Sequence, residues 1–343
     1  MKNRNDTIDI LRGIAVLLMI FGHAIQYGSG QLWINSEGYF DNYIFKFIYG
    51  FHMPLFMLIS GYLFFYSLKK NSFWENIKNK IITLLLPIFV WSVLYNVFIR
   101  IIWNGQRIDV SFIKQFIWYI ISSFWFLWAV FFCSIVVLLV NRFFADNIFV
   151  YLVGFILTFL LPDSYNSHMY KYMYPFFVIG YLIHTYFDKK ETVKLKKQYL
   201  LILILLYICI VALYEKDIYI QISKYCVWGS NNPFRMVYIT LFRLFVGLLG
   251  SFLCLQVVYT NCAKIHDYVR ERLILLGKNS LGIYIISNYL FELILVPVSR
   301  NLSGPNYVIT IIETWVISFF SLCLIRVIKK SNIIKLLLLG GRD

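Results

Sequence analysis

Long apolar runs separated by short polar connections fill most of this 343-residue sequence. An α-helix needs roughly 20 predominantly apolar residues to cross a hydrocarbon core about 30 Å thick. Ten runs have this character, two of them short (148–162 and 172–187): 9–27, 43–67, 81–102, 116–140, 148–162, 172–187, 199–214, 236–259, 280–297 and 307–328. Because backbone polar groups in lipid must be paired within the segment, we predict an all-α, polytopic membrane bundle of about ten transmembrane helices.

The composition indicates that lipid, rather than water, surrounds most of the protein. Only 14% of the residues are charged and 60% are apolar, whereas a soluble domain carries about 25% charged residues. The net charge of +15 is compatible with nucleic-acid binding, but basic cytoplasmic loops explain it more simply in a polytopic protein. The six cysteines follow no metal-binding or disulfide spacing. We therefore expect the lipid bilayer as a partner, and neither nucleic acid nor a bound metal.

The distribution of basic residues predicts an orientation. Most of the 32 Lys and Arg residues fall in loops on the same side as the N-terminus. By the positive-inside rule this side is cytoplasmic, and both termini are predicted to lie there. The longest loop on the other side, 215–235, is too short for a separate domain. We expect residues 1–343 to form one membrane domain, without a fused extracytoplasmic domain, whose helices perform any chemistry.

The first apolar run contains two side chains that are costly in a membrane, Arg12 and His23. They are eleven residues apart, which on a helix places them within roughly 20° of one face and about 16 Å apart along the axis. Arg12, near the cytoplasmic end, can bind a phosphate or carboxylate, and Asp9 one turn earlier can orient it. His23, three turns deeper, can accept a proton. Each alone is also explained by snorkelling or helix packing, but the shared face favours a site.

Three further ionisable residues within the apolar runs are candidates for a site: His52, Arg243 and Glu313. His52 stands beside Pro54, which can break or kink the second run, at a depth compatible with that of His23. A structural hydrogen bond and a catalytic role are equally consistent with His52. Arg243 and Glu313 are charges in later runs that could simply pair with each other.

Five motifs occur in order along the chain: R-x10-H from Arg12 to His23, then FHMPLFMLISGYLF, FWFLWAVFF, YPFFVIGYLI and LGKNSLGIYIIS. This set closely resembles acyltransferase family 3, the integral-membrane acyltransferases of bacterial surface glycans, from about residue 7 to 328. The resemblance implies a bundle of roughly ten helices in the bacterial inner membrane. It also implies a cytosolic acyl-CoA donor, usually acetyl-CoA, and an acceptor hydroxyl on a surface polysaccharide or lipid-linked sugar. Many relatives carry a histidine after the GIY motif, where this chain has Ser287 and Asn288.

We predict roles for these residues on that basis. His23 is the candidate catalytic base and His52 a second base or orienting partner, while Arg12 with Asp9 binds a phosphate of the acyl-CoA. The sequence is consistent with two mechanisms: direct attack of the acceptor hydroxyl on the acyl-CoA, and a covalent acyl-histidine intermediate. Lower-ranked residues for binding substrate or stabilising the oxyanion are Ser280, Tyr284, Asn288, Arg243 and Glu313.

A different class of protein shares several of these features. A multi-helix transporter, or an exporter of glycolipid or polysaccharide, also combines buried charges, a kinked span and no soluble domain. We rank it below a membrane O-acyltransferase that works alongside the polysaccharide-biosynthesis machinery, because the ordered motifs resemble the acyltransferases.

Overall fold

The computed structural model describes residues 6–28, 38–187, 195–227, 232–295 and 306–341, and within these ranges the chain is helical with no strand. The chain divides into two compact units, which are described separately. Unit 1 comprises Met1–Ile59, Tyr186–Ser223 and Val237–Val327, and unit 2 comprises Ser60–Thr185, Lys224–Met236 and Ile328–Asp343. Helix α3 (His52–Lys70) begins in unit 1 and ends in unit 2.

Unit 1 contains the first helix of the chain and most of the last third. Besides the start of α3, it holds all or most of the following elements: α1 (Asp6–Gly28), η1 (Gly38–Asp41), α2 (Tyr43–Tyr49), α10 (Lys197–Ala212), η4 (Lys216–Ile218), α11 (Ile220–Ser223), α12 (Pro233–Asn261), η5 (Cys262–Lys264), α13 (Asp267–Lys278), α14 (Ser280–Leu290), η6 (Phe291–Leu295) and α16 (Tyr307–Ile328).

Unit 2 is built mainly from the central part of the chain. Its elements are α4 (Phe73–Lys80), η2 (Ile81–Leu85), α5 (Leu86–Leu94), η3 (Tyr95–Trp103), α6 (Val110–Ser122), α7 (Trp125–Phe144), α8 (Ile148–Leu160), α9 (Ser167–Phe187) and α17 (Asn332–Leu339).

Six stretches within the described ranges are long and apolar enough to cross a membrane. Four shorter apolar helices, 110–122, 148–160, 197–212 and 280–295, accompany them. The prediction of an all-α membrane protein is therefore confirmed. The end of the predicted run 280–297 lies outside the described residues.

Two of the predicted spans need correction. The run 116–140 is not one helix: it divides into α6 and α7, and Phe124 between them has a left-handed backbone with φ of 50°. No Gly or Pro marks this break, so the apolar pattern conceals it. The run 172–187 lies in α9, which is 21 residues long but is not among the helices apolar enough to span a membrane.

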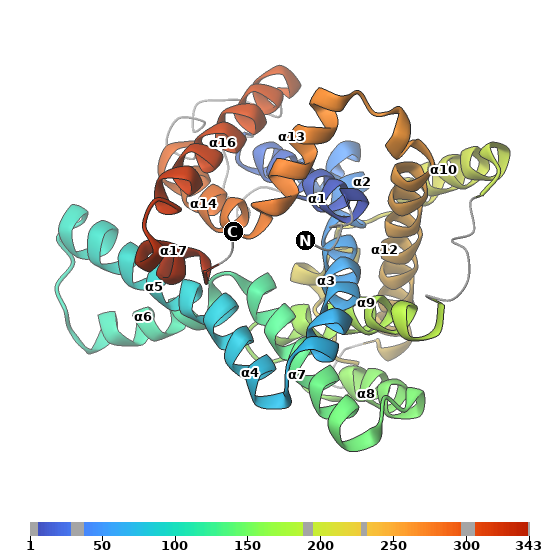
Figure 1. The fold of residues 1–343 in the computed structure, drawn as a ribbon, viewed down its shortest axis with the longest axis horizontal. Coiled ribbons are helices and arrows are strands. Elements are labelled where there is room, and N and C mark those ends of the chain that lie inside the picture. Colours follow the sequence, from blue (N-terminus) through green and yellow to red (C-terminus); the bar gives the residue numbers. More distant parts are fainter. Residues whose placement is uncertain (1–5, 29–37, 188–194, 228–231, 296–305, 342–343) are drawn as a thin grey trace. The chain divides into compact units, whose positions relative to one another are not determined.

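Close packing against α13 fixes the position of α1, and the two helices lie side by side in Figure 1. A Cβ atom added to Gly13 would collide with the carbonyl oxygen of Leu273. One added to Gly277 would collide with the carbonyl oxygen of Asp9. Glycine on each helix thus permits the backbones to approach, as small residues do at helix contacts in membranes.

The second predicted span is interrupted by a two-residue turn at 50–51, where α2 ends and α3 begins. Pro54, in the first turn of α3, has no amide hydrogen to continue a helical ladder across this point. Instead the amide of Phe51 donates to the carbonyl of Ile48 over 3.2 Å, and that of Leu55 donates to Phe51 over 2.8 Å. The break lies close to His52, where the sequence predicted it.

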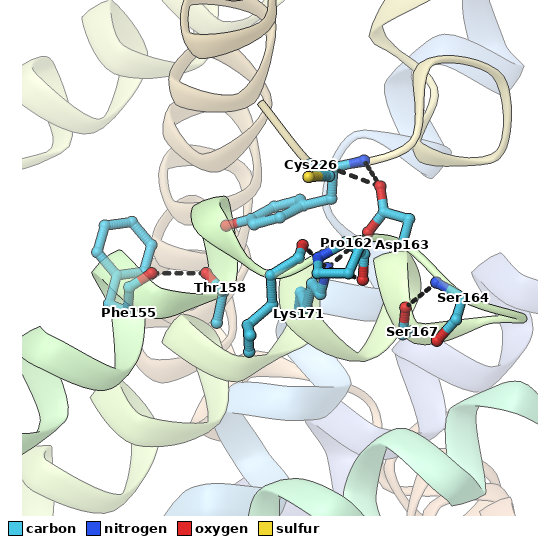
Figure 2. A network of polar contacts seen from close by, with 10 residues as sticks. Phe155, Thr158, Pro162, Asp163, Ser164, Ser167, Lys171 and Cys226 are labelled. Atoms are coloured by element: carbon cyan, nitrogen blue, oxygen red, sulfur yellow. Dashed lines mark hydrogen bonds and ion pairs between the residues drawn. The ribbon is translucent and has the colours of Figure 1, made fainter. Parts of the chain in front are cut away.

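In unit 2, a buried carboxylate anchors the segment after α11 (Figure 2). Asp163 accepts hydrogen bonds from the backbone amides of Tyr225 and Cys226 over 2.8 and 2.7 Å, and forms an ion pair with Lys171 over 2.8 Å. Lys171 also donates to the carbonyl of Pro162 over 3.0 Å. Burial alone would raise the pKa of Asp163, but the hydrogen bonds from Lys171 and the two amides outweigh burial and hold the pKa below its ordinary value.

We expect Gly277→Ala to lower the free energy of unfolding by about 2 kcal/mol, because the added methyl group forces two backbones apart. Thermal unfolding in detergent measures this. Leu201→Ala, at a position 58% exposed on α10, serves as the control and should change stability by less than about 0.5 kcal/mol. A Gly277→Ala protein as stable as the control would contradict the close packing of α1 on α13.

We expect Asp163→Asn to destabilise the protein by about 2 kcal/mol at neutral pH, because it leaves the partly buried Lys171 without its counter-ion. A carboxylate whose pKa is lowered by folding contributes stability above about pH 4, and this contribution is lost as the pH falls through the lower, folded-state pKa. The difference in the free energy of unfolding between the wild type and Asp163→Asn should therefore become smaller at acid pH. Asp267→Asn, which removes a carboxylate that is 81% exposed, should show neither effect.

Candidate active site

Arg12 makes its contacts with protein groups inside unit 1. Its Nη2 donates to Oγ of Ser280 at the start of α14 over 2.7 Å, and its Nη1 lies 3.6 Å from a carboxylate oxygen of Asp9. The guanidinium side chain is 17% exposed, whereas that of Asp9 is 3% exposed. Asp9 and Ser280 thus orient a permanently charged side chain that is not fully buried.

His23 lies at the other end of the same helix, in a polar and aromatic pocket of side chains. Its Nδ1 is 3.3 Å from Oε1 of Gln26 and 3.2 Å from the hydroxyl of Tyr49 on α2. That hydroxyl also donates to Oε1 of Gln26 over 3.2 Å. The ring of His23 packs on those of Tyr27 and Phe291, with centroids 6.0 and 5.8 Å apart.

His52 is buried beside this group. Its Nδ1 lies 2.9 Å from the carbonyl oxygen of Ile48, which can only accept, so Nδ1 carries the hydrogen and Nε2 has a lone pair. The ring of Tyr49 contacts that of His52 edge-on, with centroids 4.8 Å apart. Tyr49 contacts both histidines, with its hydroxyl 3.2 Å from Nδ1 of His23 and its ring edge-on to that of His52. The structure thus brings His23 and His52 together.

The two ends of the site are connected by a pair of helices that run in the same direction. Arg12 contacts Ser280, and His23 contacts Phe291 eleven residues further along the chain, so both contacts have the same sequence offset. Since α1 is continuous from Asp6 to Gly28, the two contacts are about 16 Å apart along its axis. The helix α14 and its continuation η6 therefore follow α1 from the arginine to the histidine.

The lower-ranked residues of α14 fall into two groups. Ser280 accepts a hydrogen bond from Arg12 and therefore lies at the arginine end of α14. Tyr284 and Asn288 follow one and two turns later along the side of α14 that carries both contacts, and both are partly exposed. Ser287 is buried, with its hydroxyl 3.3 Å from the carbonyl of Tyr284.

Arg243 and Glu313 do not form the pair that the sequence suggested. Arg243 is fully buried on α12 and donates to the carbonyl of Ile218 over 2.6 Å and to the hydroxyl of Ser223. It therefore anchors the segment that holds η4 and α11. Glu313 on α16 is 8% exposed, and one of its carboxylate oxygens has no hydrogen-bond partner within the described ranges. Neither residue contacts Arg12 or His23 in the part of the chain that is described.

Sequence reasoning missed four residues that surround His23. Gln26, three residues after His23 on the same helix, could have been found from its spacing. Tyr27 also lies one turn away. Tyr49 and Phe291 reach His23 only because α2 and η6 pack against α1, and no local pattern reveals such a contact.

Comparisons with known proteins identify the family of this chain. The family model described as an acyltransferase domain matches residues 5–329. Nodulation protein NolL of Mesorhizobium japonicum is 25% identical over 303 residues, which are 85% of this chain and 78% of that protein. Nodulation protein NolL of Sinorhizobium fredii is 28% identical over 202 residues, 58% of this chain and 54% of that protein. No solved structure matches the chain.

The family match favours an enzyme over the transporter or exporter that was the alternative from the sequence, since it extends over nearly the whole chain and includes every helix of the site. Together with the apolar helices, it identifies a membrane protein that transfers acyl groups. The chain belongs to acyltransferase family 3.

Proposed function

We propose that this protein transfers an acyl group, most simply acetyl, from cytosolic acyl-CoA to a hydroxyl of a cell-surface or exported polysaccharide or glycolipid. The observation that carries the proposal is the placement of a cation and an imidazole at the two ends of the α1 and α14–η6 pair. Arg12 can bind an anionic acyl donor, and His23 can accept a proton about three helical turns away.

The arginine end suits the head of acyl-CoA. Arg12 presents a planar fork of N–H donors that matches the oxygens of a phosphate. Asp9 and Ser280 hold this fork in one orientation. The orientation from the positive-inside rule puts this end at the cytoplasmic surface, where acyl-CoA is available. The extended arm of the donor would then follow α1 and α14 towards His23.

The histidine end suits the acyl transfer itself. A sugar hydroxyl is a poor nucleophile until a base removes its proton during attack. In the proposed step, Nε2 of His23 takes the hydroxyl proton as the oxygen attacks the thioester carbonyl. The tetrahedral intermediate collapses by breaking the carbon–sulfur bond, and the proton passes from the imidazolium to the CoA thiolate. The products are an ester and free CoA.

The remaining residues support these two ends. His52 packs on Tyr49, which also contacts His23, and in this proposal its Nε2 orients the acceptor hydroxyl. Asn288 and Tyr284, on the side of α14 that continues to Phe291, are the nearest candidates on that helix to donate a hydrogen bond to the oxyanion. We place the enzyme in the bacterial inner membrane, alongside the machinery that makes the acceptor polysaccharide.

We expect His23→Ala to abolish transfer, because it deletes the imidazole that removes the hydroxyl proton in the proposed step. The assay uses purified protein with labelled acetyl-CoA and glycan fractions, and it measures both CoA release and labelled ester. Proof of folding comes from unchanged thermal unfolding of the variant. Ester formation by His23→Ala at the wild-type rate would remove the assignment. A stoichiometric burst of CoA release without acceptor would indicate a covalent acyl-histidine rather than direct attack.

We expect Arg12→Ala to raise the KM for acetyl-CoA roughly 30-fold, the effect of losing about 2 kcal/mol from a charge-assisted hydrogen bond to the donor. The kcat at saturating donor should change much less, since Arg12 lies away from the reacting atoms. The matched control is Arg270→Ala on α13, which removes a cation from an ion pair with the exposed Asp267. An unchanged KM in Arg12→Ala would contradict donor binding at this end.

A further inference from the structure

Nδ1 of His23 forms a closed triangle of polar atoms with Oε1 of Gln26 and the hydroxyl of Tyr49. The distances are 3.3 Å from Nδ1 to Oε1 of Gln26, 3.2 Å from Nδ1 to the hydroxyl of Tyr49, and 3.2 Å from that hydroxyl to Oε1. All three side chains belong to unit 1, on α1 and α2. Each member of the triangle therefore limits where the hydrogens of the other two can lie.

The chemistry of the triangle decides the position of the ring hydrogen. The amide oxygen of Gln26 can only accept, so the hydroxyl of Tyr49 donates to it. Because the Tyr49 hydroxyl hydrogen is used in this bond to Gln26, the Tyr49 oxygen can only accept a hydrogen bond from Nδ1 of His23. Both neighbours of Nδ1 are then acceptors, and a neutral imidazole satisfies them only with its hydrogen on Nδ1.

We propose that Gln26 and Tyr49 are positioning residues that hold His23 as the tautomer with hydrogen on Nδ1, leaving the lone pair on Nε2 to accept the proton of the acceptor hydroxyl. This inference rests on the proposed function, in which His23 is the base. A histidine with the other tautomer would present an N–H group to the acceptor and could not remove a proton.

The packing of Tyr49 shows that its position is built into the fold. Its ring stacks on that of Phe45, with centroids 3.8 Å apart and an interplanar angle of 26°. On the side of α1, a Cβ atom at Gly22 would come within 2.7 Å of the ring of Tyr49. The absence of a side chain at Gly22 therefore gives Tyr49 the room it needs to reach His23.

The hydrogen of His52 is held on Nδ1 in a similar way. The carbonyl of Ile48 takes the Nδ1 hydrogen of His52, as Gln26 and Tyr49 take that of His23. Each imidazole is thus held through Nδ1 by groups of α1 and α2. A neutral second imidazole next to the base avoids the repulsion that two positive charges would produce.

The direct test is nitrogen-15 NMR of the full-length protein labelled on histidine and held in lipid at about pH 8, where imidazole is neutral. The chain has five histidines, and loss of a signal in His23→Asn assigns the resonances of His23. We expect a protonated Nδ1 and a bare Nε2 in the wild type, and a mixture of tautomers in the Gln26→Leu, Tyr49→Phe double variant. A wild-type spectrum with a bare Nδ1 would overturn the proposal.

Kinetics provide the second measurement. We expect Tyr49→Phe to lower kcat about 10-fold and Gln26→Leu about 100-fold, with the KM for acetyl-CoA unchanged in both. The controls are Tyr207→Phe, which loses a hydroxyl bonded to the carbonyl of Phe47, and Gln256→Leu, which loses a contact with the amide of Leu195; both should keep the wild-type kcat.

The outcomes separate this inference from the function on which it rests. If His23→Ala still transfers acyl groups, the assignment of the base fails and the inference falls with it. If His23→Ala is inactive while Gln26→Leu and Tyr49→Phe have the wild-type kcat, the proposed function stands and the inference alone is wrong.

Discussion

The side-by-side packing of α1 with α14 and η6 is the feature on which the whole site depends. Arg12 and His23 belong to one helix, but each obtains its environment from another element: Ser280 at one end, and Phe291 and Tyr49 at the other. The close approach of α1 and α13 at two glycines fixes the helix that carries both groups. If α1 turned about its axis, both groups would lose these partners, because they share one face.

Polar groups in an apolar bundle persist only where hydrogen bonds replace those lost from water. The structure meets this requirement in different ways. The buried Arg243 satisfies a backbone carbonyl and a serine, which ties a connecting segment to α12. His52 satisfies the carbonyl of Ile48 near the break between α2 and α3. The side chain of Arg12 is 17% exposed and contacts Asp9 and Ser280. Of these two arginines, only the one at the proposed donor end is partly exposed.

The fold class and much of the site could be predicted from the sequence, because both follow from local periodicity. Apolar runs predicted the helices, the eleven-residue spacing put Arg12 and His23 on one face, and the three-residue spacing put Asp9 beside Arg12. The break at Phe124 could not be predicted, since it falls in an apolar run without Gly or Pro. Contacts between distant segments could not be predicted either, such as those of Arg12 with Ser280 and of Arg243 with Ile218.

The central claim is that the two ends of this site perform separate tasks, donor binding at Arg12 and acyl transfer at His23. Equilibrium binding of acetyl-CoA to the purified variants tests this separation most directly. We predict that His23→Ala binds acetyl-CoA with the wild-type Kd, whereas Arg12→Ala binds it at least tenfold more weakly. Loss of binding in His23→Ala, or a wild-type Kd in Arg12→Ala, would contradict the account.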